Sequence, residues 1–203
     1  MATKAKGNVQ DRILETALAI AEKEGWAGVG PSAVADRAKV PLTELRRHYR
    51  DADAIANAWF ARALDAMLAP PPRGFARRPP PERLEILLLR WFDALALHRR
   101  VTAEMLSQKM WVFHPHHYVP MVFSLSRLIQ WLRDAAGLRA GGRRKQVEET
   151  GLTLLFLATL AVWCRDETEG QERTRAFLRA RLGQADNAMG RLFGGAGKKD
   201  KAA

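Results

Sequence analysis

Apolar residues recur at helical spacing along nearly the whole chain. At the start, Val9, Ile13, Ala17 and Ile20 draw one apolar stripe. β-branched residues are sparse and no run alternates with period two, so the pattern disfavours strands. It predicts an all-α fold, an N-terminal three-helix helix-turn-helix module plus a C-terminal helical bundle, with about nine helices in total. The expected helices cover about residues 9–24, 31–38, 42–49, 52–68, 81–98, 101–110, 121–136, 144–165 and 171–192.

Glycine and proline set the expected ends of these helices. Gly25 occupies the position of a left-handed cap, and Pro31 is a favourable first helical residue. The run PPPRGFARRPPP at 70–81 cannot continue a helix and predicts a stiff linker. The run HPHHYVP at 114–120 predicts a second break.

Residues 30–50, GPSAVADRAKVPLTELRRHYR, have the pattern of a helix-turn-helix. The small Ala35 allows close approach of the second helix, while Val40 and Leu45 fill the angle between the two. The turn falls at Lys39, where the backbone of this motif tends to be left-handed. A lysine adopts that conformation at a cost of about 1–2 kcal/mol.

The second of these helices presents an arginine pair that fits the major groove of DNA. Arg46 or Arg47 can bridge a guanine, and Pro41–Leu42 or Thr43 can touch thymine methyl groups. The expected DNA-contacting residues are Pro41, Leu42, Thr43, Arg46, Arg47, His48, Tyr49 and Arg50. The alternative is a motif kept only for packing, with the arginines on a solvated face.

Charge and cysteine content narrow the expected partners. The formal net charge is +11 and the pI about 10.5, which favours nucleic acid first and an anionic membrane second, although the excess is dispersed along the chain. The single cysteine, Cys164, excludes a disulfide within the chain and fits a reducing cytoplasm. The basic N-terminus has no apolar stretch behind it, so it is not a secretory signal. The cytoplasm is therefore the expected location.

The motif and its surroundings resemble the TetR family of bacterial transcriptional regulators. The resemblance rests on Ile13, Leu14, Ala17 and Gly25–Trp26, on AVADRAKVPLTELRRHY at 33–49, and on the step RDADAI into the next helix. It implies a homodimer that binds a palindromic operator in double-stranded DNA and responds to a small apolar or aromatic effector, most often as a repressor.

Four positions depart from the family pattern. Gly30 stands where Ser or Thr usually caps the second helix, and Lys39 stands at the usual glycine of the turn. Arg46 replaces a common tyrosine, and Ala52 replaces a lysine that commonly touches phosphate. Arg46, Arg47 or Arg50 can take over that phosphate contact.

Parts of the chain also look like the lipid-binding accessory family of ubiquinone biosynthesis, which shares the TetR fold. These are GW at 25–26, LALHRR at 95–100, LATLAVWCRDETEG at 157–170 and RAFLRARL at 175–182. The alternative function is thus a lipid- or quinone-binding accessory protein without sequence-specific DNA binding, which meets membranes through a late amphipathic helix.

The layout divides the chain into five expected segments. They are a helix-turn-helix DNA-binding domain at 1–51, a connecting helix at 52–69, the Pro-rich linker at 70–81, a ligand-binding and dimerisation domain at 82–193, and a flexible basic tail at 194–203. The helix from 144 to 165 is apolar nearly all round, so it can meet the core on one face and a partner on another. The expected dimer residues are Gly151, Leu154, Leu155, Ala158, Val162, Phe177 and Arg181.

Bulky side chains with a few polar groups make the C-terminal part a candidate effector pocket. The candidate lining residues are Trp91, His98, Met105, Gln108, Trp111, Phe113, His117, Tyr118, Met121 and Trp131. Plain core packing is the alternative for most of them.

No cofactor, metal site or catalytic activity is expected. His114, His116 and His117 lie close together, but Pro115 splits them and no carboxylate or cysteine stands beside them. Nucleophile-elbow, metalloprotease and phosphate-loop motifs are absent from the sequence.

Overall fold

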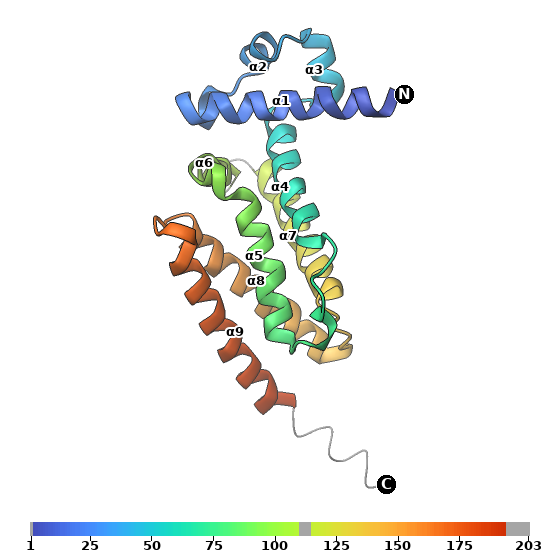
Figure 1. Cartoon of the computed structure of the whole chain (residues 1–203), viewed down its shortest axis with the longest axis vertical. Coiled ribbons are helices and arrows are strands. Elements are labelled where there is room, and N and C mark those ends of the chain that lie inside the picture. The colour runs from blue at the N-terminus through green and yellow to red at the C-terminus, as the bar shows by residue number, and fades with distance from the viewer. Residues whose placement is uncertain (1, 110–114, 194–203) are drawn as a thin grey trace. The chain divides into compact units, whose positions relative to one another are not determined.

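A computed structural model of the chain describes residues 2–109 and 115–193, and the side chains of residues 9–108 and 124–193. These residues form helices and short 3₁₀ turns with no strand among them, so the all-α prediction is confirmed (Figure 1). The helices are α1 (Ala2–Glu24), α2 (Pro31–Ala38), α3 (Leu42–His48), α4 (Ala52–Leu68), α5 (Pro80–Leu95), α6 (Arg99–Lys109), α7 (Pro115–Ala135), α8 (Gly142–Trp163) and α9 (Glu172–Phe193).

The predicted helices correspond to the observed ones, with two corrections at their starts. Helix α1 begins at Ala2 and not at Val9, because the alanines and lysines before the apolar stripe are good helix formers. Helix α7 begins at Pro115, so the predicted break at 114–120 is wrong from Pro115 onward. Proline is well tolerated as a first helical residue, since its missing N–H has no partner there in any case.

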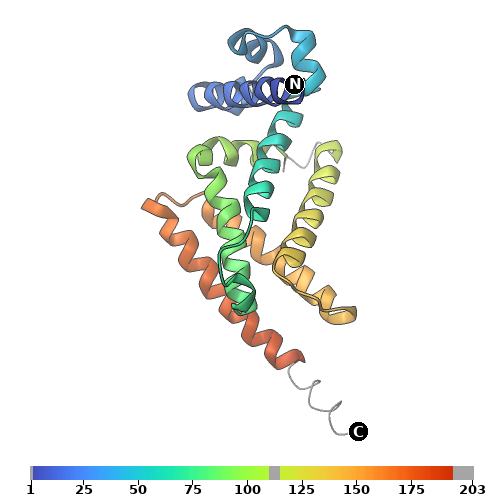
Figure 2. The same ribbon diagram turned by 45° about the vertical axis from the view of Figure 1, so that its right-hand side comes forward.

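One compact unit consists of Met1–Asp65 and Asp93–Tyr118. Helices α2 and α3 pack beside α1, as both ribbon views show (Figure 2). The inner stripe of α1, including Ile13, Ala17 and Leu18, is fully buried. The indole Nε1 of Trp59 in α4 donates to Oγ1 of Thr102 in α6 at 2.9 Å, so α4 and α6 belong to the core of this unit as well.

The second compact unit consists of Ala66–Phe92 and Val119–Ala203. Its core contains an aromatic cluster in which Phe92 lies 5.8 Å from Phe156 and 5.7 Å from Trp163 between ring centroids. Helices α8 and α9 pack side by side, with Leu178 and Leu182 of α9 buried.

The Pro-rich segment of this second unit is folded onto its neighbours. Phe75 lies in a short 3₁₀ turn (Phe75–Arg77) and is 7% exposed. Nη1 and Nη2 of Arg90 in α5 donate to the carbonyl oxygens of Ala69 at 2.8 Å and Pro70 at 3.3 Å. One buried aromatic side chain and one arginine therefore fix a segment whose sequence predicts only a stiff connection.

Among the described helices, none combines the length and the hydropathy that crossing a membrane requires.

Candidate nucleic-acid interface

The turn between α2 and α3 has the left-handed backbone that the sequence predicts. Lys39 has φ 53° and ψ 48°, and its backbone N–H donates to the carbonyl oxygen of Asp36 at 3.2 Å. The N–H of Val40 donates to the carbonyl oxygen of Ala35 at 3.0 Å, which closes the turn. The turn thus forms without the usual glycine, at a cost of about 1–2 kcal/mol.

The buried side of the motif fixes the position of α3. Ala35, Val40 and Leu45 are all buried, as the sequence predicts for the residues between the two helices. Tyr49 is 4% exposed, and its hydroxyl donates to the carbonyl oxygen of Gln10 in α1 at 3.4 Å. Burial raises the pKa of the Tyr49 hydroxyl. Its buried position makes Tyr49 a packing residue between α3 and α1.

The opposite side of α3 is open. Leu42 is 51% exposed, and Pro41, Thr43, Arg46, Arg47 and Arg50 are exposed as well. Six of the eight predicted DNA-contacting residues therefore share an open surface, whereas Tyr49 and the His48 side chain, which is 5% exposed, do not.

Glu44 is a charged residue of this surface that is not among the predicted DNA-contacting residues. Its Oε2 accepts a hydrogen bond from Nη1 of Arg47 at 3.0 Å, and its Oε1 lies 3.2 Å from Nε2 of His48. The hydrogen bonds from Arg47 and His48 lower the pKa of the Glu44 carboxyl. An acidic residue placed three and four positions before two basic ones on a helix is a readable signal for such pairs.

The residues that follow α3 lead directly into α4. Oδ1 of Asp51 accepts from the backbone N–H of Ala54 at 2.7 Å, and Oδ2 accepts from Nε of Arg50 at 3.0 Å. Asp51 therefore caps the first turn of α4, which begins at Ala52.

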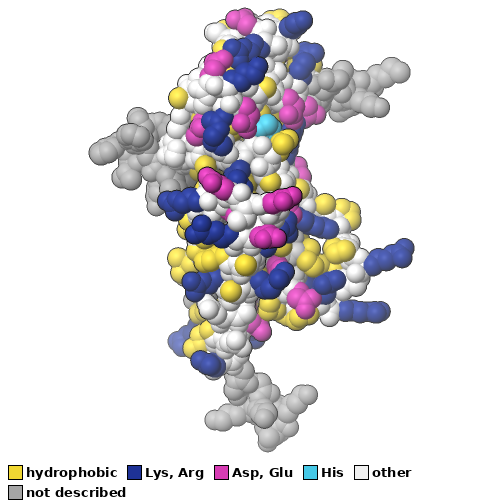
Figure 3. Space-filling model, turned by 60° about the vertical axis from the view of Figure 1, so that its left-hand side comes forward, with side chains coloured by type: hydrophobic (Ala, Val, Ile, Leu, Met, Phe, Trp, Pro, Cys, Tyr) yellow, Lys and Arg dark blue, Asp and Glu magenta, His cyan; other side chains and the backbone are white. Residues whose placement is uncertain are grey.

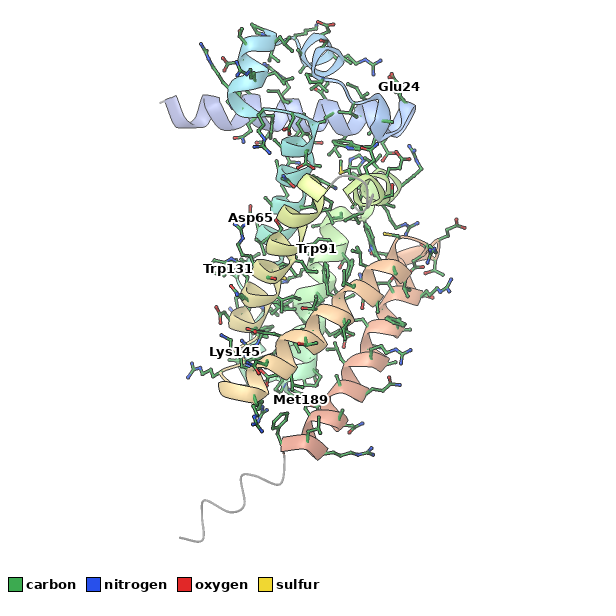
Figure 4. The ribbon with its side chains drawn as sticks, turned by 180° about the vertical axis from the view of Figure 1, so that it is seen from behind. Glu24, Asp65, Trp91, Trp131, Lys145 and Met189 are labelled. Atoms are coloured by element: carbon green, nitrogen blue, oxygen red, sulfur yellow. The ribbon has the colours of Figure 1, made fainter. Side chains whose placement is uncertain are left out.

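The effector-pocket candidates have different environments. Trp91 and Met105 are buried, His98 is partly buried, and Gln108 is exposed. Trp131 on α7 is 52% exposed, and Figure 4 labels it together with Trp91 on α5. The side chains of Trp111, Phe113, His117, Tyr118 and Met121 lie outside the described residues, as do those of His114 and His116.

The dimer candidates fall mainly on an open face of α8. Gly151 and Ala158 are exposed, Leu154 is 63% exposed, and Val162 is partly buried, whereas Leu155 is buried within its own chain. On α9 the guanidinium of Arg181 lies 5.2 Å from the ring centroid of the partly buried Phe177.

Charge of both signs is spread over the face shown in Figure 3, where lysine and arginine side chains alternate with aspartate and glutamate.

Within the described part of the chain, no three histidine, cysteine, aspartate or glutamate residues group in a way that could hold a metal ion.

Solved structures of similar proteins include two TetR transcriptional regulators. The chain is 37% identical to a TetR transcriptional regulator from Nitrosomonas europaea ATCC 19718, with a TM-score of 0.77 over 87% of this chain and 97% of that chain. A TetR transcriptional regulator from Rhodococcus sp. RHA1 is 20% identical, with a TM-score of 0.65 over 91% and 97% of the two chains. The multidrug binding protein EbrR, solved in complex with imidazole, is 21% identical with a TM-score of 0.50 over 85% and 88%.

No protein-family model matches the chain, and no curated protein matches it. The helix-turn-helix and the all-α architecture nevertheless match those of TetR transcriptional regulators. With 37% identity over nearly the full length of the Nitrosomonas protein, the chain belongs to the TetR family of transcriptional regulators.

Proposed function

We propose that this protein binds a palindromic operator in double-stranded DNA as a homodimer, represses transcription there, and releases the DNA when a small apolar or aromatic effector binds. The observation that carries the proposal is the geometry of α3. Its inner side is fixed by buried Leu45 and Tyr49, while Arg46 and Arg47 stand on the open side.

The open residues of α3 match the chemistry of base edges in the major groove. An arginine can form two hydrogen bonds to O6 and N7 of guanine, and Leu42 and Thr43 can contact the methyl group of thymine. Arg50 is exposed, and we expect it to contact phosphate, which sets register without carrying sequence information. The side chains of His48 and Tyr49 are largely buried, so we expect them to hold α3 in position.

One module of this size makes few base contacts, so tight specific binding needs two copies on two half-sites. The exposed apolar side chains of α8 supply a surface for pairing, and the symmetry of a homodimer then requires a palindromic operator.

The effector acts by changing the equilibrium between two states of the homodimer that differ in the distance between its DNA-binding modules. A ligand that binds one spacing better than the other shifts the population toward it. The bulky residues of the C-terminal part, such as Trp91, favour an apolar or aromatic ligand. Its action in the cytoplasm involves neither catalysis nor a cofactor.

The test is selection of bound duplexes from a random library at about 150 mM salt, with wild-type protein and with the R46A/R47A variant. Wild-type protein should enrich a palindrome. The variant should lose that enrichment while keeping its fold, because an arginine–guanine contact is worth about 1–3 kcal/mol. The R73A/R77A variant removes the same charge from exposed positions outside the motif and should select the wild-type sequence.

If wild-type protein enriches no motif and R46A/R47A changes nothing, the proposal is wrong. Vesicles containing quinones or anionic lipids then become the ligands to test, since the alternative function predicts binding to them.

A further inference from the structure

The basic side chains of α3 differ in whether they contact an acidic residue. Arg47 donates to Glu44 at 3.0 Å, and His48 Nε2 lies 3.2 Å from the same carboxylate. Arg46 is exposed and makes no hydrogen bond or ion pair with the described part of the chain. Although the sequence shows an arginine pair, α3 therefore presents one guanidinium without a partner in the described part of the chain and one that is paired with a carboxylate.

A carboxylate on this surface is unfavourable for general attraction to DNA. Non-specific binding comes from basic groups that neutralise phosphates, and its strength depends on how many of them do so. Glu44, with a side chain that is 34% exposed, repels phosphate and occupies Arg47 at the same time. The Glu44–Arg47 pair therefore lowers the affinity for all DNA sequences equally. A contact between a side chain and a base, in contrast, is lost only when the DNA sequence differs from the operator.

We propose that Glu44 is a specificity-determining residue of the DNA-binding surface, which acts by neutralising and positioning Arg47 so that Arg46 remains the free cation of α3. This inference rests on the proposed function, because it concerns the same surface. The expected partner is a DNA duplex in which Arg46 binds the major-groove edge of a guanine. The Glu44–Arg47 pair beside this contact contributes little to phosphate binding.

The experiment measures affinity for a selected operator and for a scrambled duplex over a series of salt concentrations. In E44Q, Arg47 becomes available to phosphate. The plot of log K against log salt for scrambled DNA should therefore become steeper by about 0.9, the contribution of one neutralised phosphate. The ratio of operator to scrambled affinity should fall by about tenfold, which is within the range for one lost base-pair preference.

The double variant E44Q/R47A tests whether Glu44 acts through Arg47. Removing both charges should return the salt slope for scrambled DNA to the wild-type value, since the pair contributes no net charge. A merely structural role of Glu44 would lower the melting temperature and leave the salt slope unchanged.

A matched control is E82Q. Glu82 pairs with Arg78 on the exposed surface at 3.2 Å, so this variant makes the same charge change outside α3. It should keep the wild-type slope and ratio. An equal shift in E82Q would overturn the inference, because total charge would then explain the effect.

The remaining outcomes separate this inference from the proposed function. If wild-type protein selects an operator but E44Q keeps both its ratio and its slope, only the inference is wrong. If E44Q melts like wild type and binds no DNA, Glu44 is a required contact and the inference is again wrong. If wild-type protein selects no operator, both fail.

Discussion

At the scale of single residues, Asp166 is the acid whose pKa is shifted most among the described side chains. It is fully buried between α8 and α9, and its two carboxylate oxygens accept from the hydroxyl and backbone N–H groups of Thr168 and Thr174 at 2.5–3.0 Å. Burial alone would raise the pKa of Asp166, but the hydrogen bonds from the two threonines together outweigh it and lower the pKa to about 2.

Replacement of this carboxylate should destabilise the fold in a pH-dependent way. Because its pKa in the folded state lies below the unfolded value of about 3.9, the charged form stabilises the fold above pH 4, and this stabilisation is lost between about pH 4 and pH 2. Near pH 7, D166N should unfold with a free energy about 2 kcal/mol below that of wild type. Urea unfolding at several pH values measures it.

The difference between D166N and wild type should shrink as the pH falls toward 2. D186N, at an exposed position on α9, provides the control and should unfold like wild type throughout. A difference that stays constant over this pH range would show that packing, and not the charge of Asp166, stabilises this end of α8.

At the scale of elements, hydrogen bonds made by Glu104 and Arg100 connect α6 to the C-terminal end of α1. Oε2 of Glu104 accepts from the backbone N–H of Trp26 at 2.6 Å, and Oε1 accepts from Nη1 of Arg100 at 2.8 Å. Nη2 of Arg100 in turn donates to the carbonyl oxygen of Glu22 at 2.5 Å. These bonds satisfy backbone groups at the C-terminal end of α1.

Loss of the Glu104 carboxylate should loosen this attachment. In E104A the N–H of Trp26 loses its partner in a partly buried position, so the free energy of unfolding should fall by about 1–3 kcal/mol. Q108A, at an exposed position on the same helix, should have little effect. Chemical denaturation of the two variants measures the difference. Equal stability of E104A and wild type would mean that water replaces the carboxylate at no cost.

Local sequence pattern is sufficient to predict most helices and the helix-turn-helix. The apolar stripe of α1, Pro31 at the start of α2 and the small Ala35 each act within a few residues of their own position. The left-handed Lys39 is predictable for the same reason, because the turn imposes it on whichever residue stands there.

The rest depends on contacts that sequence pattern does not encode. Glu104 and Trp26 lie 78 positions apart in the sequence. Leu154 and Leu155 are adjacent and chemically identical, yet one is 63% exposed and the other 9%, because only the second side chain turns toward its own unit. In the candidate site, the spacing of Glu44 before Arg47 and His48 permits these pairs, but only the structure shows that Glu44 contacts both side chains.

At the scale of the whole molecule, the open face of α8 is the strongest feature that a single chain leaves unexplained. Val147, Leu154 and Leu157 are 40%, 63% and 41% exposed, and the small residues Gly151 and Ala158 of the same helix are exposed as well. Small residues allow a partner helix to approach closely, while the leucines supply apolar area. A stable interface needs about 800 Å² from each partner.

We therefore expect L154E to convert a dimer into a monomer, since a charge at the centre of an apolar interface is left without a partner. Light scattering coupled to gel filtration measures the mass. L97E places the same charge at a residue that is 84% exposed on a short turn before α6, and it should remain dimeric. A wild-type protein that is monomeric at micromolar concentration would contradict the homodimer.

Because L154E leaves α3 intact, it should keep the wild-type affinity per module for scrambled DNA while losing selection of the palindrome. This result would attribute operator recognition to the pairing of two modules.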